Sequence, residues 1–316
     1  YKLYKIYIMT IIISKVASGM CNRLVPFLTG LRLAKKLNTK YYIYWDDNCT
    51  DTDYSYMGER TSYSDMFEYI KDVNHIQINE LHTLLNTSNK LIVYYCKHTI
   101  QNYTIEELLQ YDVIFFNDYT HPISIKNDDT HISSYSDSME WVSNNSNYGN
   151  DIKNIFELLI PKKYIQDKIN EVLLHFPENK DNIIGIHLRH WPSIWLKNQN
   201  VKEGNNYDNK IEYMNKCIKQ NPETKFYICS SDITLINNTI KLFGDKIIYF
   251  KNRFGETHGD MYYSSDETTS RGNKNLNING VVDMYAMSKC NTILGNKGSS
   301  YSLSAALLNK KSIYMV

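Results

Sequence analysis

The sequence predicts an α/β protein made of two Rossmann-like domains. Short apolar runs rich in β-branched residues, typical of buried strands, alternate with segments whose apolar residues recur at helical spacing. This alternation is typical of parallel sheets joined by right-handed crossovers. The 316 residues are also enough for about two domains.

The first half of the chain begins with a strand–helix–strand unit. Its expected elements are a strand over 6–13, a helix over 23–37, and strands over 41–45, 91–95 and 113–116. The run Thr104 to Glu107 has the capping-box pattern that begins a helix. The stretches 46–89 and 117–150 are polar and show little periodicity, so we interpret them as irregular.

The second half of the chain is more regular. Two helical patterns, 152–159 and 162–176, precede it, and we place the domain boundary so that the domains are 1–176 and 177–316. The expected strands are 183–188, 225–229, 246–250, 292–294 and 312–316, and the expected helices are 210–220, 233–243, 280–288 and 300–308.

Composition excludes several classes of protein. The net charge of +1 argues against a general nucleic-acid binder. The six cysteines form no C-x-x-C pair, which argues against structural zinc and suits reduced thiols in the cytoplasm. The apolar run 6–13 is shorter than the roughly 20 residues of a spanning helix. We expect no stable membrane insertion, and an anchor upstream of Tyr1 stays open.

Ligands of doubly wound sheets bind beyond the carboxyl ends of strands, and the predicted strand 183–188 delivers His187 and Arg189 to such an end. Alternation puts these two side chains on the same side of the strand. The guanidinium offers a fork of donors that suits a pyrophosphate. An arginine held in a salt bridge is the structural alternative.

A second candidate site follows the strand 292–294. Glycines Gly295 and Gly298 allow a sharp turn, and Ser299 and Ser300 precede a helix whose N-terminus offers free N–H groups to an anion. The alternative is a serine that only caps the helix.

Two further segments carry polar candidates. The carboxylate of Asp283 can accept two hydrogen bonds from the N1–H and N2–H₂ edge of guanine, which uracil lacks. The alternative is an exposed aspartate near a helix N-terminus. Asn22 and Arg23 follow the first strand and could contact a phosphate or sugar, or belong to a turn with a helix cap.

Taken together, these segments resemble the fucosyltransferase superfamily, which includes nodulation and core α-1,6-fucosyltransferases and protein O-fucosyltransferases. The resemblance covers residues 183–316 and 6–45 best, and the order of the motifs also agrees. The matching segments are 19–24 (GMCNRL), 185–190 (GIHLRH), 226–232 (FYICSSD), 283–290 (DMYAMSKC) and 298–300 (GSS).

The resemblance implies a GT-B-like fold of two facing Rossmann-like domains. The C-terminal domain would bind GDP-fucose, the N-terminal domain would help to bind a glycan acceptor, and transfer would invert the anomeric carbon without a metal or other cofactor. By position, Arg189 would bind the β-phosphate and stabilise the departing GDP. The other implied donor contacts are Asn22, Arg23, His187 (mainly through its backbone), Asp232 at the nucleotide pocket, Asp283 on guanine, and Gly298, Ser299 and Ser300 on phosphate.

The sequence departs from the family after Arg189, where many members have a nearby Asp or Glu. The catalytic base therefore stays open among Glu203, Asp46, Asp47 and Asp118, and substrate-assisted or weakly based catalysis is a further alternative. Trp191 and Trp195 could stack on a sugar, although aromatic packing is the default. We interpret the D-x-D metal-like motif at 51–53 as a solvated loop. Two alternatives remain: a transferase that uses another GDP-sugar, and a non-catalytic nucleotide-sugar-binding protein.

Overall fold

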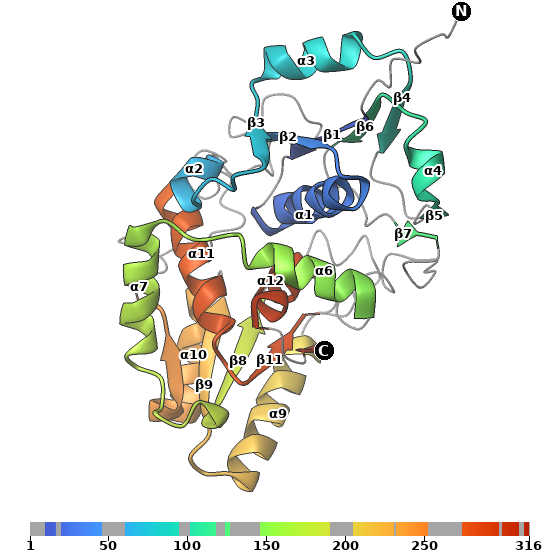
Figure 1. Ribbon diagram of the computed structural model, residues 1–316. Helices are drawn as coiled ribbons and strands as arrows, with labels where there is room; N and C mark the ends of the chain where they lie inside the picture. Colours follow the sequence, from blue (N-terminus) through green and yellow to red (C-terminus); the bar gives the residue numbers. More distant parts are fainter. Residues whose placement is uncertain are drawn as a thin grey trace, which may run out of the picture. The chain divides into compact units, whose positions relative to one another are not determined.

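The chain folds into two compact units, Tyr1–Ser55 with Glu68–Leu159 and Tyr56–Phe67 with Ile160–Val316 (Figure 1). Each unit contains a five-stranded sheet with parallel pairing, so the predicted α/β fold of two Rossmann-like domains is confirmed. The computed structural model describes residues 10–16, 20–45, 61–94, 102–117, 124–126, 146–189, 205–230, 232–251, 274–296, 299–309 and 313–315.

The N-terminal unit is built on a sheet with the strand order β3-β2-β1-β6-β4. Its strands are β1 (Ile11–Val16), β2 (Lys40–Trp45), β3 (Val73–His75), β4 (Leu91–Tyr94) and β6 (Val113–Asn117), and a separate pair consists of β5 (Asn102–Tyr103) and β7 (Ser124–Ile125). The strand β1, which is buried from Ile12 to Val16, lies at the centre, where Ile13 pairs with Tyr42 on one side and Phe115 on the other.

Helices cover both faces of this sheet (Figure 1). The helices are α1 (Met20–Leu37), α3 (Ile78–Asn86), α4 (Ile105–Leu108) and α6 (Ser146–Phe156). Leu81 of α3 packs on Ile13 and Phe115 in one apolar cluster. α1 packs on the opposite face, because Gly30 brings the helix so close to the sheet that an added Cβ would lie 2.5 Å from Ser14 Oγ.

The C-terminal unit has the strand order β10-β9-β8-β11-β12. Its strands are β8 (Ile183–Leu188), β9 (Lys225–Ser230), β10 (Ile247–Tyr249), β11 (Thr292–Gly295) and β12 (Ile313–Met315). Its helices are α2 (Tyr63–Met66), α7 (Lys163–Leu173), α9 (Asn205–Gln220), α10 (Ile233–Phe243), α11 (Lys274–Met287) and α12 (Ser300–Asn309), with 3₁₀ turns η2 (Lys180–Asn182) and η3 (Gly244–Lys246).

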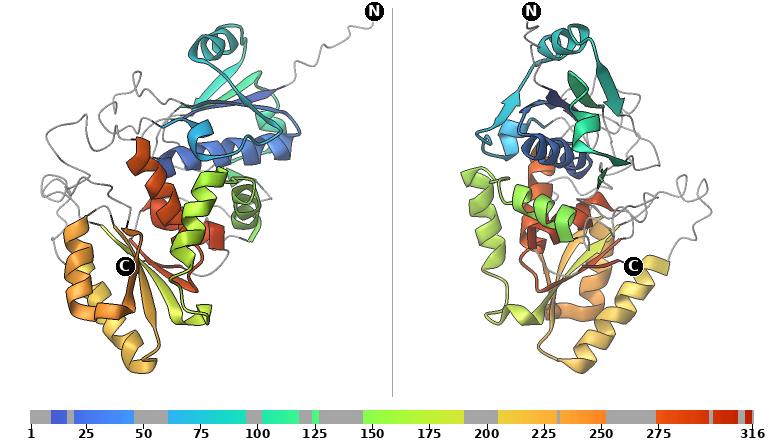
Figure 2. Two further views of the ribbon diagram at one scale, coloured as in Figure 1. Left: turned by 90° about the vertical axis from the view of Figure 1, so that its left-hand side faces the viewer. Right: turned by 45° about the vertical axis from the view of Figure 1, so that its right-hand side comes forward.

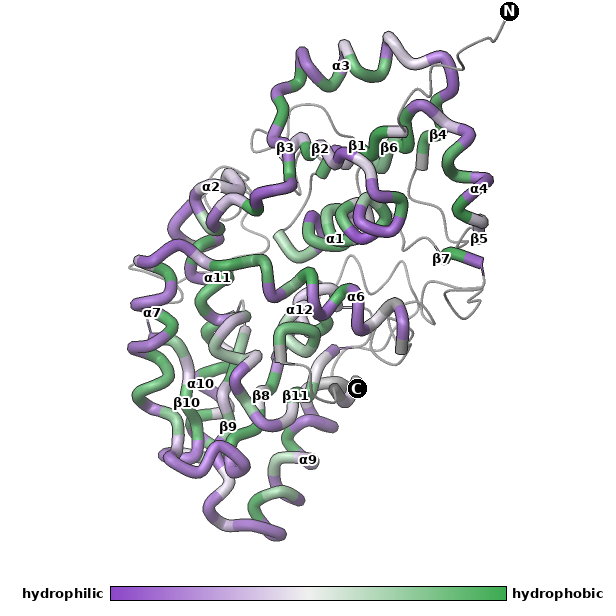
Figure 3. Tube along the Cα trace, in the orientation of Figure 1, coloured by the Kyte–Doolittle hydropathy of each residue, from purple (hydrophilic) through white to green (hydrophobic). Residues whose placement is uncertain are grey.

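Successive side chains of β8 point to opposite faces of the sheet and therefore contact two different layers of helices. Figure 2 shows these layers on opposite sides of the sheet. Ile186 and Leu188 pack with Met214 of α9 and Ile236 of α10. On the other face, Gly185 lies under the end of α11, where an added Cβ would be 2.8 Å from Met287 Cγ. Helices α7 and α9 carry a polar and an apolar side, which is visible in Figure 3, whereas residues 277–287 of α11 are all buried.

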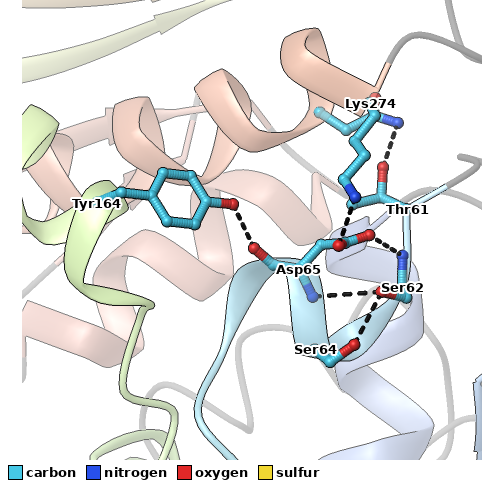
Figure 4. Close-up of polar contacts among 7 residues, drawn as sticks. Thr61, Ser62, Ser64, Asp65, Tyr164 and Lys274 are labelled. Atoms are coloured by element: carbon cyan, nitrogen blue, oxygen red, sulfur yellow. Dashed lines mark hydrogen bonds and ion pairs between the residues drawn. The ribbon is translucent and has the colours of Figure 1, made fainter.

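A segment from the first half of the sequence, residues 61–67, folds with the C-terminal unit. α2 begins with a capping box, in which Ser62 Oγ accepts from the Asp65 N–H (3.2 Å) and the Asp65 carboxylate accepts from the Ser62 N–H (3.1 Å). Lys274 of α11 forms an ion pair of 2.5 Å with the same carboxylate, and Tyr164 donates to the Asp65 carbonyl (Figure 4). Asn277 Nδ2 donates to Thr61 Oγ1 at 2.8 Å.

The backbone completes this attachment, because the Lys162 N–H donates to the Met66 carbonyl at 2.9 Å and Phe67 forms an isolated bridge with Pro161. The chain therefore passes between the units three times, after Ser55, Phe67 and Leu159.

We expected a single boundary after residue 176. In the structure α7 belongs with the C-terminal unit because it packs on α11.

The stretches that we expected to be irregular contain regular elements. β3, α2 and α3 lie within 46–89, and β7 and the start of α6 lie within 117–150. β3 has three residues, too few for a periodic pattern, and it forms by pairing with β2. No helix among the described residues is long and apolar enough to span a membrane.

Candidate functional site

The strand order of the C-terminal sheet creates a switch point between β8 and β11. From β8 the chain adds β9 and β10 on one side, and it then returns to add β11 and β12 on the other. Leu294 pairs with Ile186, so the two neighbouring strands end close together. Arg189 directly follows β8 and Asn296 directly follows β11. Ligands of open α/β sheets bind beyond the carboxyl ends of strands at such a point.

The N-terminus of α12 lies just beyond β11. Ser299 is fully buried, its N–H donates to the Asn296 carbonyl (3.0 Å), and its Oγ accepts from the Ser302 N–H (3.4 Å). Ser299 therefore caps the helix, as the structural alternative proposed. Ser300 is half-buried in the first turn. A helix N-terminus offers N–H groups and a positive dipole end to an anion, so capping and anion binding are compatible here.

His187 takes part in a buried polar network at the end of β8. Its Nδ1 lies 2.7 Å from Ser302 Oγ and 3.0 Å from Asn296 Nδ2, and Asn296 Nδ2 also donates to the His187 carbonyl at 3.0 Å. Tyr301 contacts the imidazole with ring centroids 4.9 Å apart. The expected backbone contact of His187 with a nucleotide stays a prediction.

Lys210 of α9 reaches the same network from the other helical layer. Its Nζ donates to the His187 carbonyl at 2.7 Å and to Asn296 Oδ1 at 2.5 Å, and the side chain is 1% exposed. Burial lowers the pKa of Lys210 to about 7, because the charged ammonium loses its hydration. Among the described residues, no carboxylate forms an ion pair with this amino group.

Arg189 is half-buried, and it is the first residue after β8. Alternation continued past His187 directs it toward the α11 and α12 side of the sheet, where the N-terminus of α12 lies. The sequence motif thus brings a guanidinium and a helix N-terminus to two adjacent strand ends. Both are groups that bind phosphate.

Asp283 lies inside the C-terminal unit and is 3% exposed. Tyr227 of β9 donates to Asp283 Oδ1 at 2.5 Å. Burial, followed by the nearby Asp283 charge, raises the pKa of Tyr227 well above its ordinary value. The alternative of an exposed aspartate near a helix N-terminus is wrong, because Asp283 lies in the last turns of α11 and is buried. Recognition of guanine by Asp283 stays a prediction.

Asp232 caps α10. Its Oδ1 accepts from the Thr234 N–H at 2.7 Å, and its own N–H donates to Ser230 Oγ at 3.0 Å. The capping of α10 is therefore a sufficient structural reason for an aspartate at the end of the motif 226–232. Its expected role at the nucleotide pocket stays a prediction.

Asn22 and Arg23 lie in the first turn of α1, which begins at Met20, before the expected start at Arg23. Asn22 is half-buried, whereas Arg23 is 1% exposed and its guanidinium carbon lies 5.2 Å from the centroid of the Trp45 ring. This cation–π contact lies at the end of β2 and makes Arg23 part of the packing of the N-terminal unit. Contacts of both residues with the donor stay predictions.

Several predicted positions lie outside the described residues. They are Gly298, the four candidate bases Glu203, Asp46, Asp47 and Asp118, the tryptophans Trp191 and Trp195, and the D-x-D motif at 51–53. Within the described part of the chain, no group of three or more His, Cys, Asp or Glu residues could hold a metal ion.

The sequence motifs did not reveal Lys210, Asn296 or Ser302 as one network. One signal for Lys210 was present, because it falls four residues before the fully buried Met214 and therefore on the apolar side of α9. A lysine in an apolar stripe needs a buried partner. Its partners are the His187 carbonyl in β8 and the Asn296 side chain after β11. No sequence pattern near Lys210 indicates these contacts.

The structure was compared with known proteins. No protein-family model and no curated protein matches the sequence. The structure is similar to the fucosyltransferase NodZ from Bradyrhizobium, with a TM-score of 0.56 and 13% identity over 95% of this chain and 93% of that chain. It is also similar to a mutant of Arabidopsis thaliana FUT1 in complex with GDP, with a TM-score of 0.55 and 10% identity over 97% of this chain and 70% of that one.

A third similar structure is POFUT1 in complex with GDP-fucose, with a TM-score of 0.50 and 9% identity over 95% of this chain and 94% of that chain. The chain therefore shares the GT-B-like α/β fold of fucosyltransferases over nearly its whole length. At these identities the similarity establishes the fold, and the predicted resemblance to this class of enzymes is confirmed at that level.

Proposed function

We propose that the protein is an inverting glycosyltransferase that moves fucose from GDP-fucose to a hydroxyl of a glycan or other acceptor without a metal ion. The observation that carries the proposal is the switch point of the C-terminal sheet, where Arg189 and the N-terminus of α12 follow adjacent strand ends. The shared fold adds support, since NodZ was crystallised with GDP and soaked with GDP-fucose, and POFUT1 with GDP-fucose.

The proposed mechanism follows from where charge develops. Cleavage of the sugar–phosphate bond leaves positive charge on the sugar and negative charge on the β-phosphate oxygen. A preorganised guanidinium at Arg189 would stabilise that oxygen, together with the N–H groups that begin α12 and the Ser300 hydroxyl. These groups supply the charge stabilisation that a divalent ion supplies in other transferases. Arg189 is the catalytic residue of this proposal.

Selectivity for guanine is assigned to Asp283. Tyr227 holds Oδ1 of this carboxylate in place within the unit. A carboxylate fixed in this way can accept from the N1–H and N2–H₂ groups of guanine, whereas uracil offers no such pair of donors. Asp283→Asn would replace one acceptor by a donor and would weaken GDP binding relative to UDP.

The test is calorimetric titration of the purified chain with GDP, UDP and ADP in the presence of EDTA. We expect selective binding of GDP, and a loss of at least about tenfold in GDP affinity in Arg189→Ala, because one charge-assisted contact to phosphate disappears. The matched control is Lys241→Ala, which removes an exposed cation in the last turn of α10. This turn lies shortly before the start of β10, at the end of the sheet away from the carboxyl ends of the strands. Its GDP affinity should equal that of the wild type.

A preference for UDP, or no nucleotide binding, would overturn the proposal. Unchanged binding in Arg189→Ala would remove the phosphate assignment. Tight GDP binding without hydrolysis or transfer of GDP-fucose would favour a non-catalytic nucleotide-binding protein, and turnover of a different GDP-sugar would change the donor but keep the mechanism.

A further inference from the structure

The two helical layers of the C-terminal unit meet in one polar network at the switch point. Lys210 comes from α9 on one face of the sheet, and Ser302 comes from α12 on the other. Asn296 joins them: its Oδ1 accepts from Lys210, its Nδ2 donates to His187, and its N–H donates to Ser302 Oγ at 3.1 Å. The network therefore fixes His187, two positions before Arg189, and Asn296, three positions before the Ser299 cap of α12.

The network also orients the Asn296 amide. An amino group donates to the amide oxygen of Asn296, so the amide nitrogen faces His187. This nitrogen lies 3.0 Å from His187 Nδ1, and Ser302 Oγ lies 2.7 Å from the same ring atom.

Lys210 is unusual because it is a buried amino group whose hydrogen-bond partners among the described residues are all neutral. Its acceptors are a backbone carbonyl and an amide oxygen, and its side chain is 1% exposed. A buried charge without a counter-charge is costly, and an anion bound nearby removes part of that cost. The carbonyl that Lys210 holds belongs to the residue two positions before Arg189, next to the expected phosphate site.

We propose that Lys210 is a positioning residue of the diphosphate site, which fixes the ends of β8 and β11 and takes up a proton when the anionic ligand binds. The proposal rests on the proposed function, because it requires a nucleoside diphosphate at this edge of the sheet. In the free protein the pKa of about 7 leaves Lys210 mostly neutral above neutral pH. A bound diphosphate raises the pKa by about 1–3, as an opposite charge does.

The other titratable groups around Lys210 have contacts of their own or are exposed. His187 Nδ1 lies 2.7 Å from Ser302 Oγ, and the Tyr301 ring is tilted against the imidazole at a centroid distance of 4.9 Å. On α9 itself, Tyr207 shares a hydrogen bond of 3.1 Å with Thr239 and Tyr213 has a pKa raised to about 12 by burial. The carboxylates Asp208 and Glu212 are exposed, and Glu212 pairs with Lys216.

The test is calorimetry of GDP binding to the full chain at about pH 8, in Tris and in HEPES, whose ionisation enthalpies differ. The terminal phosphate of GDP is already ionised there, so proton uptake reports the protein. We expect the wild type to take up roughly half a proton or more per GDP, and its affinity to fall by about fivefold from about pH 7.5 to 8.5. Lys210→Met should lose both the uptake and about tenfold in affinity near pH 7.

Lys210→Arg is the second variant, because its charge is fixed in this pH range. It should bind GDP without proton uptake, whereas a residue that only fills space would leave the uptake of the wild type unchanged in both variants. If Lys210→Met does not fold, the proton uptake of the wild type and of Lys210→Arg still tests the proposal. GDP binding without uptake, or equal uptake in wild type and variants, overturns the role of Lys210 alone. No binding of GDP to the wild type overturns the proposed function, and this inference with it.

Discussion

The two sheets place different side chains at equivalent switch points. In the N-terminal unit, β1 and β6 flank the switch point, and the cation that follows β1, Arg23, is buried against Trp45. In the C-terminal unit, β8 and β11 flank it, and Arg189 is half-buried at the end of β8, the strand next to β11. The order of the last two strands also differs between the sheets. In the N-terminal sheet β6 lies next to β1 and the earlier strand β4 lies at the edge, whereas in the C-terminal sheet β11 lies next to β8 and the later strand β12 lies at the edge.

The difference between the side chains at the two switch points shows that strand order alone does not define a binding site. Both sheets have a strand order that reverses at the central strand, and in both an arginine follows that strand in the sequence. In the C-terminal sheet a buried amino group, an amide and a helix N-terminus converge on the two strand ends. The comparison predicts that arginine substitutions affect stability in one unit and binding in the other.

The largest effect on stability is expected from Arg23→Ala. The change removes a long side chain that is 1% exposed and stacked over Trp45, so it leaves a cavity. We expect the free energy of unfolding to fall by about 2–4 kcal/mol in urea denaturation. Lys35→Ala, at an exposed position of the same helix, should change it by less than about 0.5 kcal/mol. Equal effects of both variants would contradict the packing role of Arg23.

A smaller effect is expected where each unit brings a helix close to its central strand through a glycine. In Gly30→Ala the new Cβ would lie 2.5 Å from Ser14 Oγ and 2.6 Å from Cε2 of the buried Tyr41 ring, and in Gly185→Ala it would lie 2.8 Å from Met287 Cγ. A methionine side chain moves aside more easily than a packed ring. Thermal unfolding should therefore show a loss of about 2–3 kcal/mol for Gly30→Ala and about 1–2 kcal/mol for Gly185→Ala.

The glycine comparison has an internal check. If crowding at Ser14 causes the loss, Ser14→Ala should recover part of the stability when it is combined with Gly30→Ala. An additive double variant would show that the Tyr41 ring alone opposes the new methyl group. A greater loss in Gly185→Ala than in Gly30→Ala would reverse the order that the two contacts predict.

The smallest effect concerns pH and the N-terminal unit. Burial lowers the pKa of His75 on β3 to about 4, whereas an unfolded histidine titrates near 6.5. Between these values the unfolded chain binds a proton that the folded protein does not. Stability should therefore fall by on the order of 1–2 kcal/mol as the pH decreases from about 7 to about 5.

His75→Phe keeps the ring that meets Tyr69 at a centroid distance of 4.7 Å and removes the titration. Urea unfolding at both pH values should show a weaker pH dependence for this variant. His82→Gln, at an exposed position of the neighbouring helix α3, should keep the dependence of the wild type. If His75→Phe keeps it as well, another group causes the loss of stability in acid.

Much of the fold could be predicted because the long elements are periodic and bury one face. The sequence predicts β8 and α10 with the bounds that the structure has, and the capping box at Thr104 begins α4 as expected. Short elements such as β3 could not be predicted, because pairing with β2 rather than local preference makes them regular.

The candidate site was predictable only where a motif ends a strand or begins a helix. This applies to Arg189 and to Ser299 and Ser300. The roles of Lys210 and Tyr227 depend on contacts across 23 and 56 residues of sequence, and no local pattern encodes such contacts. The burial of Asp283 was likewise decided by the position of α11 on the sheet, not by its neighbours in sequence.

The attachment of residues 61–67 to the C-terminal unit affects how the protein could be divided or recombined. A fragment that begins at Ile160 would retain all five strands of its sheet but would lose the partners of Lys274 and Asn277. The ion pair between Asp65 and Lys274 spans 209 residues, so it can form during synthesis only after most of the chain has left the ribosome. An exchange of halves with a structurally similar two-domain protein would therefore need to transplant two pieces of the chain, not one.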